Sequence, residues 1–468
     1  MRIRSTRARL RDCSTSMRSD VSRGWPWLFA LAGFAFDVGA SWPGQVSFDA
    51  AYAWWQARGG ETSTLVPPAF VLAWRASLAF ADGPGGMFAL QLALFWSGLA
   101  LVAQALGTSV LRGIALFVLV GFAPVVLVLR AHVWTDVALF AALVFASGAM
   151  AQVAAGGRRH WLLPAVLALG WATLLRHNAL PATVPLIAWA SMLALRGRRA
   201  PWRVFALAST LLITFLAGGR LLDAQAARQV PVWPSLAQFD LAAISVATDR
   251  LYLPAFMHGP TLDVADLARA FRPWSNTPML QGTRGGLRDP FDPPLDAAEL
   301  AALRSAWLDA VRAEPRAWLA HRWRLARALF GQRAPDWPRE LAYVDAMVAF
   351  RDNPPLHAND GRLHRLVAAL AQRLHASVGL AAWPCLVPGL LALPFAWRKR
   401  AGIDGRLSLV LLASAWLYAL PLVVLAPAAE LRYLGWACVA NLMAAVSVLI
   451  GSSARAARLP RAPCEDRP

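Results

Sequence analysis

Residues 86–106 read GMFALQLALFWSGLALVAQAL, an apolar run without a charged residue. The hydrocarbon core of a bilayer is crossed by about 20 apolar residues in a helix, so this run is long enough to span a membrane. Nine further runs are also predominantly apolar, although several are shorter: 25–41, 109–129, 134–155, 161–175, 178–195, 203–219, 379–396, 407–427 and 433–451. The sequence therefore predicts an all-α polytopic membrane protein with about ten transmembrane helices.

The composition excludes an ordinary soluble domain. The 468 residues are 57% hydrophobic and 16% charged, with a mean hydropathy of +0.45, whereas soluble domains are about 45–50% apolar and about 25% charged. The net charge is +19, and Lys399 is the single lysine among 46 basic residues. Because the arginines lie between apolar runs and form no basic stripe, we expect a lipid bilayer and no nucleic acid as the partner.

The distribution of basic residues predicts the orientation. With ten spans, 22 of the 46 basic residues fall on the side that carries both termini, and six fall on the short opposite loops. The other 18 lie in residues 221–378, where 16 acidic residues balance them. By the positive-inside rule both termini are cytoplasmic. The arginine and alanine richness looks like that of a high-GC bacterial genome, so we expect the bacterial inner membrane.

This topology divides the chain into five parts. They are a basic cytoplasmic tail (1–24), an N-terminal transmembrane module (25–220) with an exoplasmic loop (42–85), an exoplasmic or periplasmic domain (221–378), C-terminal transmembrane helices (379–452) and a second cytoplasmic tail (453–468). The exoplasmic domain, between spans seven and eight, reads as mixed and mostly helical, with helices expected near 295–331 and 360–377.

Two segments are expected to lie at the membrane surface. Residues 67–80 are too short to span, begin with Pro67-Pro68 and contain Arg75, so a helix in the interface is expected. Residues 315–330 read PRAWLAHRWRLARALF, an amphipathic helix with a basic side. It could meet anionic lipid or a phosphate on the outer face, and membrane docking alone also explains it.

Polar residues near span ends are costly unless they are paired or functional, so they indicate where chemistry takes place. Five connections deliver such residues to the exoplasmic rim: Asp49, Arg130, His132, Asp136, Arg176, His177, Asn178, Asp240, Glu430, Arg432 and Tyr433. We expect the candidate site among them.

The first loop, residues 42–60, reads WPGQVSFDAAYAWWQARGG. Ser47 is a candidate N-cap and Gly59 a candidate stop, which predicts a short aromatic helix. Asp49 then lies in the first turn, where the helix dipole favours the ionised carboxylate. Such a carboxylate could act as a general base toward a hydroxyl or amine acceptor, or it could simply complement the dipole.

His132 and Asp136 lie four residues apart and share a helix face if the helix begins by Ala131. They could bind a divalent metal or orient an acceptor, but two ligands without a third indicate a metal only weakly, and a His–carboxylate pair within one helix is more common. No cofactor is therefore required by the sequence, and a divalent metal stays an alternative. Asn178 is expected to cap the following span, and Asp240 heads a short apolar run near the membrane surface.

The first exoplasmic loop resembles that of the GT-C superfamily of membrane glycosyltransferases. This superfamily includes protein O-mannosyltransferases, bacterial aminoarabinose transferases and a bacterial branch of uncharacterised multipass proteins. The resemblance rests on Asp49, Tyr52, Gly59-Gly60, Pro67-Pro68 and Gly83-Pro84-Gly85, and on the long insert between spans seven and eight. Ala50 and Val66 depart from the pattern, because many relatives carry Glu at the first position and Lys or His at the second.

The resemblance implies an inverting transfer of a sugar from a polyprenyl-phosphate donor to an envelope glycan, lipid or protein acceptor. Asp49 would be the catalytic base. Arg432, and after it Arg176, would hold the leaving phosphate through the guanidinium fork, unless both merely anchor the chain at the interface. The remaining candidate substrate-binding residues are Tyr52, His132, Asp136, Asp240, Glu430 and Tyr433.

Two other functions are open. A transporter or flippase of lipid-linked sugars would carry polar residues near the middle of the membrane and repeat-related broken helices, and the predicted spans are almost free of charge in their middle parts. A non-catalytic membrane protein of polysaccharide assembly is the other alternative. We therefore expect the transferase.

Overall fold

The computed structural model describes residues 24–451 except 177, 196–199, 283–285, 333–336, 339–340 and 376. Both predicted tails and His177 thus lie outside the described residues. The described chain is helical without a β-strand, and its extended pairings are isolated bridges. The prediction of an all-α protein is confirmed.

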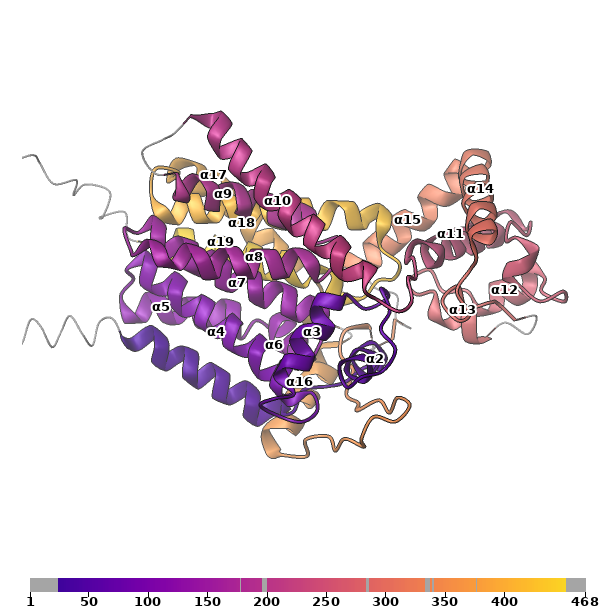
Figure 1. Ribbon diagram of the computed structural model, residues 1–468, viewed down its shortest axis with the longest axis horizontal. Helices are drawn as coiled ribbons and strands as arrows, with labels where there is room; N and C mark the ends of the chain where they lie inside the picture. Colours follow the sequence, from indigo (N-terminus) through magenta and orange to yellow (C-terminus); the bar gives the residue numbers. More distant parts are fainter. Residues whose placement is uncertain are drawn as a thin grey trace, which may run out of the picture.

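Within the described residues, five segments are long and apolar enough to cross a membrane. They are α4 (Gly85–Leu106), α7 (Thr135–Ala154), α10 (Pro201–Ala224), α18 (Ile403–Leu425) and Leu431–Ile450, which combines η6 (Leu431–Leu434) with α19 (Gly435–Ile450). The other predicted runs also form helices: residues 24–41, α8 (Leu162–Leu174), α9 (Leu180–Ala194) and α17 (Trp383–Arg398). Figure 1 shows these helices side by side in one elongated bundle.

The predicted span at 109–129 is not one straight helix. It consists of α5 (Val110–Leu116), the π-helical turn η1 (Phe117–Gly121) and α6 (Pro124–Arg130), and the two parts are bent by 63°. Pro124 explains the break, because proline lacks the N–H that would continue the preceding helix and is well accepted in the first turn of a new one. If the bent pair is counted as one span, the candidates number six.

The centre of the bundle is the pair α4 and α7. Gly98 of α4 faces α7 so closely that a Cβ there would lie 2.6 Å from the backbone nitrogen of Phe145, and a Cβ on Gly148 would collide with the carbonyl oxygen of Gly98. Small residues allow apolar helices to approach in this way. The helix α7 is consequently buried along most of its length, and α8, α18 and α19 pack beside it.

A polar lobe extends beyond one end of the bundle (Figure 1). We define the lobe as residues 226–331, with α11 (Trp233–Thr248), η3 (Ala255–Met257), α12 (Val264–Ala270), α13 (Thr277–Gly282), α14 (Ala297–Ala313) and α15 (Pro315–Phe330). After the lobe the chain returns along the end of the bundle and forms α16 (Arg362–His375) before η5 (Val378–Leu380). The helices predicted near 295–331 and 360–377 are confirmed.

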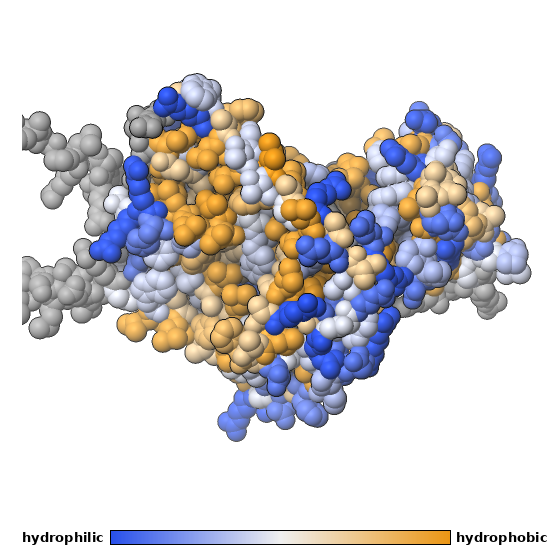
Figure 2. Space-filling view, in the orientation of Figure 1, coloured by the Kyte–Doolittle hydropathy of each residue, from blue (hydrophilic) through white to orange (hydrophobic). Residues whose placement is uncertain are grey.

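The same end of the bundle carries α2 (Phe48–Ala57) and α3 (Pro68–Ser77) (Figure 1). With ten residues, α3 is too short to cross a bilayer, as expected for residues 67–80. Figure 2 shows apolar residues over the flank of the bundle and hydrophilic residues over much of the lobe. Exposed side chains such as Leu111, Leu163 and Phe205 contribute to the apolar surface of the bundle. These features fit a multipass membrane protein whose flank contacts lipid.

Candidate functional site

Loops from distant parts of the chain meet at the lobe end of the bundle. The N–H of Gln45 donates to the carbonyl of Ala131 at 2.8 Å, and the N–H of Val133 donates to the carbonyl of Gln45 at 3.1 Å. The N–H of Val46 in turn donates to Ala346, in the segment that returns from the lobe. These bonds hold the start of α2 between the α6–α7 loop and the returning segment.

Asp49 and Arg432 form an ion pair, and this pair is the centre of the candidate site. Asp49 lies in the first turn of α2, and its Oδ2 is 2.7 Å from Nη2 of Arg432 in η6. The Asp49 side chain is 57% exposed, whereas that of Arg432 is 13% exposed. A carboxylate at the surface is thus fixed by a guanidinium that is largely withdrawn from solvent.

The helix that carries Asp49 begins and ends close to the predicted positions. Ser47 occupies the N-cap, but its hydroxyl does not cap the helix and instead accepts a 2.8 Å hydrogen bond from the indole N–H of Trp134. Gly59 follows the helix end with φ +118°, which favours glycine. The Ser47–Trp134 bond therefore joins the start of α2 to the α6–α7 loop.

Arg432 is enclosed by carboxylates and aromatic rings. Its Nε donates to Glu430, and the hydroxyl of Tyr433 donates to the same carboxylate at 3.3 Å. The guanidinium also lies 5.1 Å from the centroid of the Trp134 ring, a cation–π contact. Arg432 can therefore keep its orientation through Glu430 while the fork faces Asp49.

A second ion pair adjoins the first. Arg176, in the α8–α9 loop, pairs through Nη1 with Asp136 in the first turn of α7. The Tyr433 ring lies close to both guanidinium groups: its centroid is 5.0 Å from Cζ of Arg176 and 5.4 Å from Cζ of Arg432. We call Asp49, Glu430, Arg432, Tyr433, Arg176 and Asp136 the charged cluster.

The local electrostatics keep Arg176 charged. Burial lowers the pKa of its guanidinium, but the adjacent Asp136 carboxylate opposes this and leaves the pKa above its ordinary value. Asn178 does not cap α9, whose N-cap is Ala179, and its Oδ1 instead accepts a 3.1 Å hydrogen bond from Nε of Arg176. Asn178 thus orients the arginine, a role that the sequence did not indicate.

His132 and Asp136 do not share a helix face, because α7 begins only at Thr135. The His132 ring stacks on Trp134 with centroids 3.8 Å apart; its Nδ1 faces the carbonyl of Val128 at 3.0 Å, and its Nε2 accepts from the N–H of Val344 at 2.9 Å. Burial lowers the pKa of His132 to about 3, so the ring is neutral near pH 7. Both ring nitrogens are occupied by backbone groups, and this arrangement offers no nitrogen lone pair to a metal.

Across the described residues, no group of three or more His, Cys, Asp or Glu side chains could hold a metal ion.

Tyr52 lies one turn after Asp49 and begins an aromatic row. Its hydroxyl is hydrogen-bonded to Ser63 Oγ at 2.9 Å, and its ring stacks with Trp55 and contacts Phe350 at centroid distances of 6.1 and 5.3 Å. Tyr52 therefore lies close to Asp49, and the aromatic row that begins with it extends along α2 away from the charged cluster.

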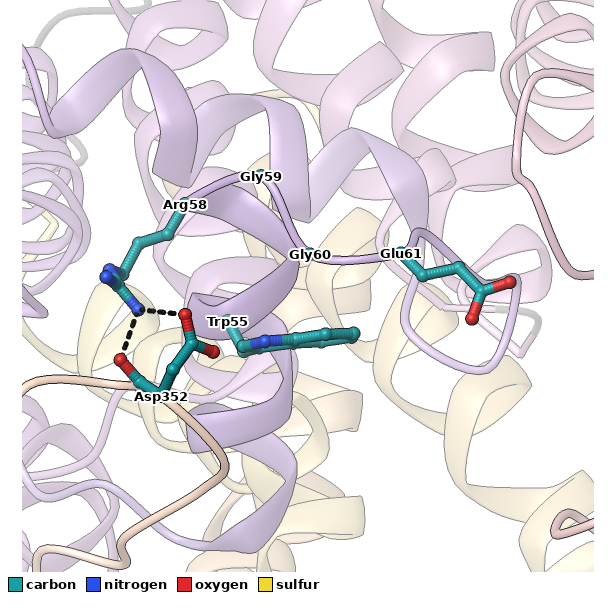
Figure 3. A pocket seen from close by; sticks show the side chains of 6 residues that line it. All are labelled: Trp55, Arg58, Gly59, Gly60, Glu61 and Asp352. Carbon is teal, nitrogen blue, oxygen red and sulfur yellow. Dashed lines mark hydrogen bonds and ion pairs between the residues drawn. The ribbon is translucent and has the colours of Figure 1, made fainter.

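A pocket of about 440 Å³ opens at the far end of this row (Figure 3), lined by Trp55, Arg58, Gly59, Gly60, Glu61 and Asp352. Figure 3 shows the Arg58 guanidinium directed at Asp352 and the Glu61 carboxylate pointing away from both. Six residues of helix, or about 9 Å, separate Trp55 from Asp49. A ligand that reaches from the cluster along α2 would meet carboxylates, a guanidinium and an indole here.

Asp240 lies in the lobe and is not part of the charged cluster. Its side chain is fully buried in α11; Oδ2 is 2.7 Å from Nη2 of Arg322 and accepts hydrogen bonds of 3.0 Å from the indoles of Trp307 and Trp318. The carboxylate is surrounded by protein donors, so the structure places it in the core of the lobe and not at a substrate surface.

Sequence reasoning missed Asp37, which forms a buried ion pair with Arg130. Asp37 lies in the helix of residues 24–41 and also accepts a 2.7 Å hydrogen bond from the indole of Trp96, while Arg130 Nη2 donates to the Gly121 carbonyl at 2.5 Å. An acid inside an apolar run is itself a signal of a buried partner.

Comparisons of this chain with protein-family models, with curated proteins and with solved structures find no match.

Proposed function

We propose that the protein is an integral membrane glycosyltransferase that moves a sugar from a polyprenyl-phosphate donor to a glycan, lipid or protein acceptor at the exoplasmic face. The observation that carries the proposal is the exposed Asp49 carboxylate, held 2.7 Å from the largely withdrawn Arg432 where loops from distant parts of the chain meet. The resemblance of residues 42–85 to the first loop of GT-C glycosyltransferases supports it.

In the proposed reaction, a hydroxyl or amine of the acceptor attacks the anomeric carbon of the donor sugar. The bond from that carbon to the phosphate oxygen breaks, the phosphate leaves with the bonding electron pair, and Asp49 takes the proton of the acceptor. Arg432 and Arg176 stabilise the negative charge of the leaving phosphate. Glu430 keeps Arg432 in place when the phosphate competes with Asp49 for the guanidinium.

We further propose ten spans in a bacterial inner membrane, with both termini in the cytoplasm. Each of the ten predicted apolar runs coincides with a helix or with the bent pair α5–α6. The charged cluster and the lobe share one end of the bundle, and the ammonium of Lys399, which donates to Val448 at 2.8 Å, lies at the opposite end of α17. This separation supports an exoplasmic site.

The second candidate is a transporter of lipid-linked sugars. The observation in its favour is the combination of a span broken by 63° with the buried Asp37–Arg130 pair, since transport paths commonly contain broken helices and intramembrane charges. In this chain the two charges pair with each other, and Asp37 also accepts a hydrogen bond from the indole of Trp96. We therefore prefer the transferase.

The test is mass spectrometry of envelope glycolipids, polysaccharide and polyprenyl-phosphate sugars from cells that lack the protein, complemented with wild type or with Asp49→Asn. The proposal expects a sugar to be missing from an acceptor while its lipid-linked donor remains. Wild type restores the sugar and Asp49→Asn does not. The matched control is Asp309→Asn, an exposed carboxylate of the lobe, which restores it fully.

Two outcomes contradict the proposal. Full complementation by Asp49→Asn moves the chemistry away from this carboxylate. Accumulation of the lipid-linked sugar on the cytoplasmic side alone, with exoplasmic transfer intact when the donor is supplied there, supports the transporter instead.

A further inference from the structure

The lobe contacts the chain segment that leads into the charged cluster. Arg322, on α15 of the lobe, donates from Nη1 to the backbone carbonyl of Ala426 at 2.8 Å. The N–H of Ala429 donates to the carbonyl of Trp274, between α12 and α13, also at 2.8 Å. We call residues 426–429 the clamped segment, because the lobe binds its backbone at both ends.

The clamped segment is buried and short. Ala426, Ala428 and Ala429 are each at most 3% exposed. Glu430 follows directly in an extended conformation, and Arg432 lies two residues further, in the 3-10 helix η6. A shift of the clamped segment would therefore move the guanidinium that faces Asp49.

The second terminal nitrogen of the Arg322 guanidinium is held by a carboxylate of the lobe. The same guanidinium is 2.7 Å from Asp240 through Nη2, and the two side chains are only 3% and 0% exposed. His321 lies 3.7 Å from Asp240, but burial and the neighbouring Arg322 lower the pKa of His321 to about 3. Near pH 7 the histidine is neutral, so Arg322 is the cation that balances the buried carboxylate.

The position of residue 322 requires a side chain that can bind a carboxylate and a carbonyl at the same time, and arginine can do so. A planar guanidinium can point one nitrogen at a carboxylate and another at a carbonyl, whereas the ammonium of lysine is a compact point charge on a flexible stem. Arg322 thus connects a carboxylate in the lobe with the end of α18 in the bundle.

We propose that Arg322, anchored by Asp240, is a positioning residue that fixes the clamped segment and thereby the place of Arg432 against Asp49. The catalytic consequence rests on the proposed transferase function. In this role Asp240 serves the site from within the lobe and touches no substrate. The lobe is then a support for the charged cluster, in addition to any part it has in binding.

The first experiment tests whether Arg322 holds the clamped segment, and it requires no assay of sugar transfer. Hydrogen exchange of backbone amides is compared by mass spectrometry in the full-length wild type, Arg322→Lys and Arg322→Gln. Loss of a hydrogen bond to a charged group predicts about tenfold faster exchange for residues 426–434 in Arg322→Gln, with less change in Arg322→Lys. The matched control is Arg327→Lys, on the same helix, whose guanidinium binds Gln332 and not the clamped segment.

The second experiment measures the effect of Arg322 on the proposed sugar transfer. Membranes with each variant receive increasing amounts of the lipid extract that carries the donor, and sugar transfer is followed. We expect Arg322→Gln to lower the maximal rate about a hundredfold at an unchanged half-saturating amount of extract. Arg322→Lys should restore part of the rate, and Asp240→Asn added to Arg322→Gln should lower it little further, because both act through one contact.

The outcomes separate the two proposals. Unchanged exchange at residues 426–434 in Arg322→Gln overturns the clamp, as does exchange that rises equally across the lobe and the spans, since that indicates general destabilisation. If wild-type membranes transfer no sugar, the proposed function fails, and the exchange data still decide whether Arg322 holds the clamped segment.

Discussion

The carboxylate of Asp37 and the guanidinium of Arg130 pair inside the bundle, where their side chains are 5% and 1% exposed. The guanidinium also lies over the rings of Phe95 and Trp96, at 4.7 and 4.6 Å from their centroids. The pair therefore ties the first apolar helix to α4 and to the end of α6. Beyond Arg130 the chain enters the loop that binds Gln45, so this pair also supports the start of α2.

Replacing Asp37 should destabilise the bundle. In Asp37→Leu the Arg130 charge loses its partner in an apolar environment, and breaking a buried pair in this way costs about 3–5 kcal/mol of unfolding free energy. Asp37→Asn keeps an acceptor for Trp96 and should lose clearly less. Thermal unfolding of the purified protein in detergent measures both, and equal losses for the two variants would contradict this account.

Arg432→Lys should abolish most of the proposed transfer while leaving the fold intact. Lysine keeps the charge but cannot bind Glu430 and face Asp49 or a phosphate with one planar fork, so we expect a rate loss of about a hundredfold or more. Sugar transfer in complemented cells measures it. Arg250→Lys, a guanidinium that lies over Tyr252 in the lobe, is the control and should retain wild-type transfer.

The stability of the fold should fall as the pH is lowered. The pKa of His132 is about 3 in the folded protein and 6.5 as the ordinary value, so below pH 6.5 the unfolded chain binds a proton that the folded chain does not. Each pH unit between about 6.5 and 3 then costs up to about 1.4 kcal/mol for this residue. His132→Gln should flatten the dependence of the unfolding temperature on pH, and an unchanged slope would contradict the assignment.

The proposed topology predicts which positions react with a membrane-impermeant thiol reagent. In a background without the tail cysteines Cys13 and Cys464, Asp352→Cys should be labelled from outside intact spheroplasts, since its side chain is 75% exposed and lines the pocket beside Trp55. Arg159→Cys, in the α7–α8 connection, should be labelled only in inverted vesicles. The opposite result for either position would change the orientation of the chain.

Apolar length predicted most of the helices, because a run such as residues 135–154 needs no distant partner to become helical in lipid. The break before Pro124 was not predicted, although a proline in an apolar run is a signal for one, and the run itself does not reveal the 63° bend. The order of the spans alone predicted which loops share one end of the bundle. The charged cluster unites Asp49, Asp136, Arg176 and Arg432 for this reason.

Pairing within the site could not be obtained from the sequence. His132 was expected beside Asp136 on one helix, yet the isolated bridge of His132 to Gln45 keeps it in a loop. Asp240 was expected near substrate, but only the folded lobe brings two indoles and Arg322 to its carboxylate. Each of these contacts joins residues far apart in the chain, and hydropathy carries no information about them.

The pairing of Asp49 with Arg432 has a consequence for biosynthesis. The ribosome makes Asp49 before the lobe and α18, whereas it makes Arg432 only after them. Until then α2 holds a carboxylate without its guanidinium, and a nascent chain stopped anywhere before η6 has no complete site. The proposed site can therefore form only after α18 and η6 have been made.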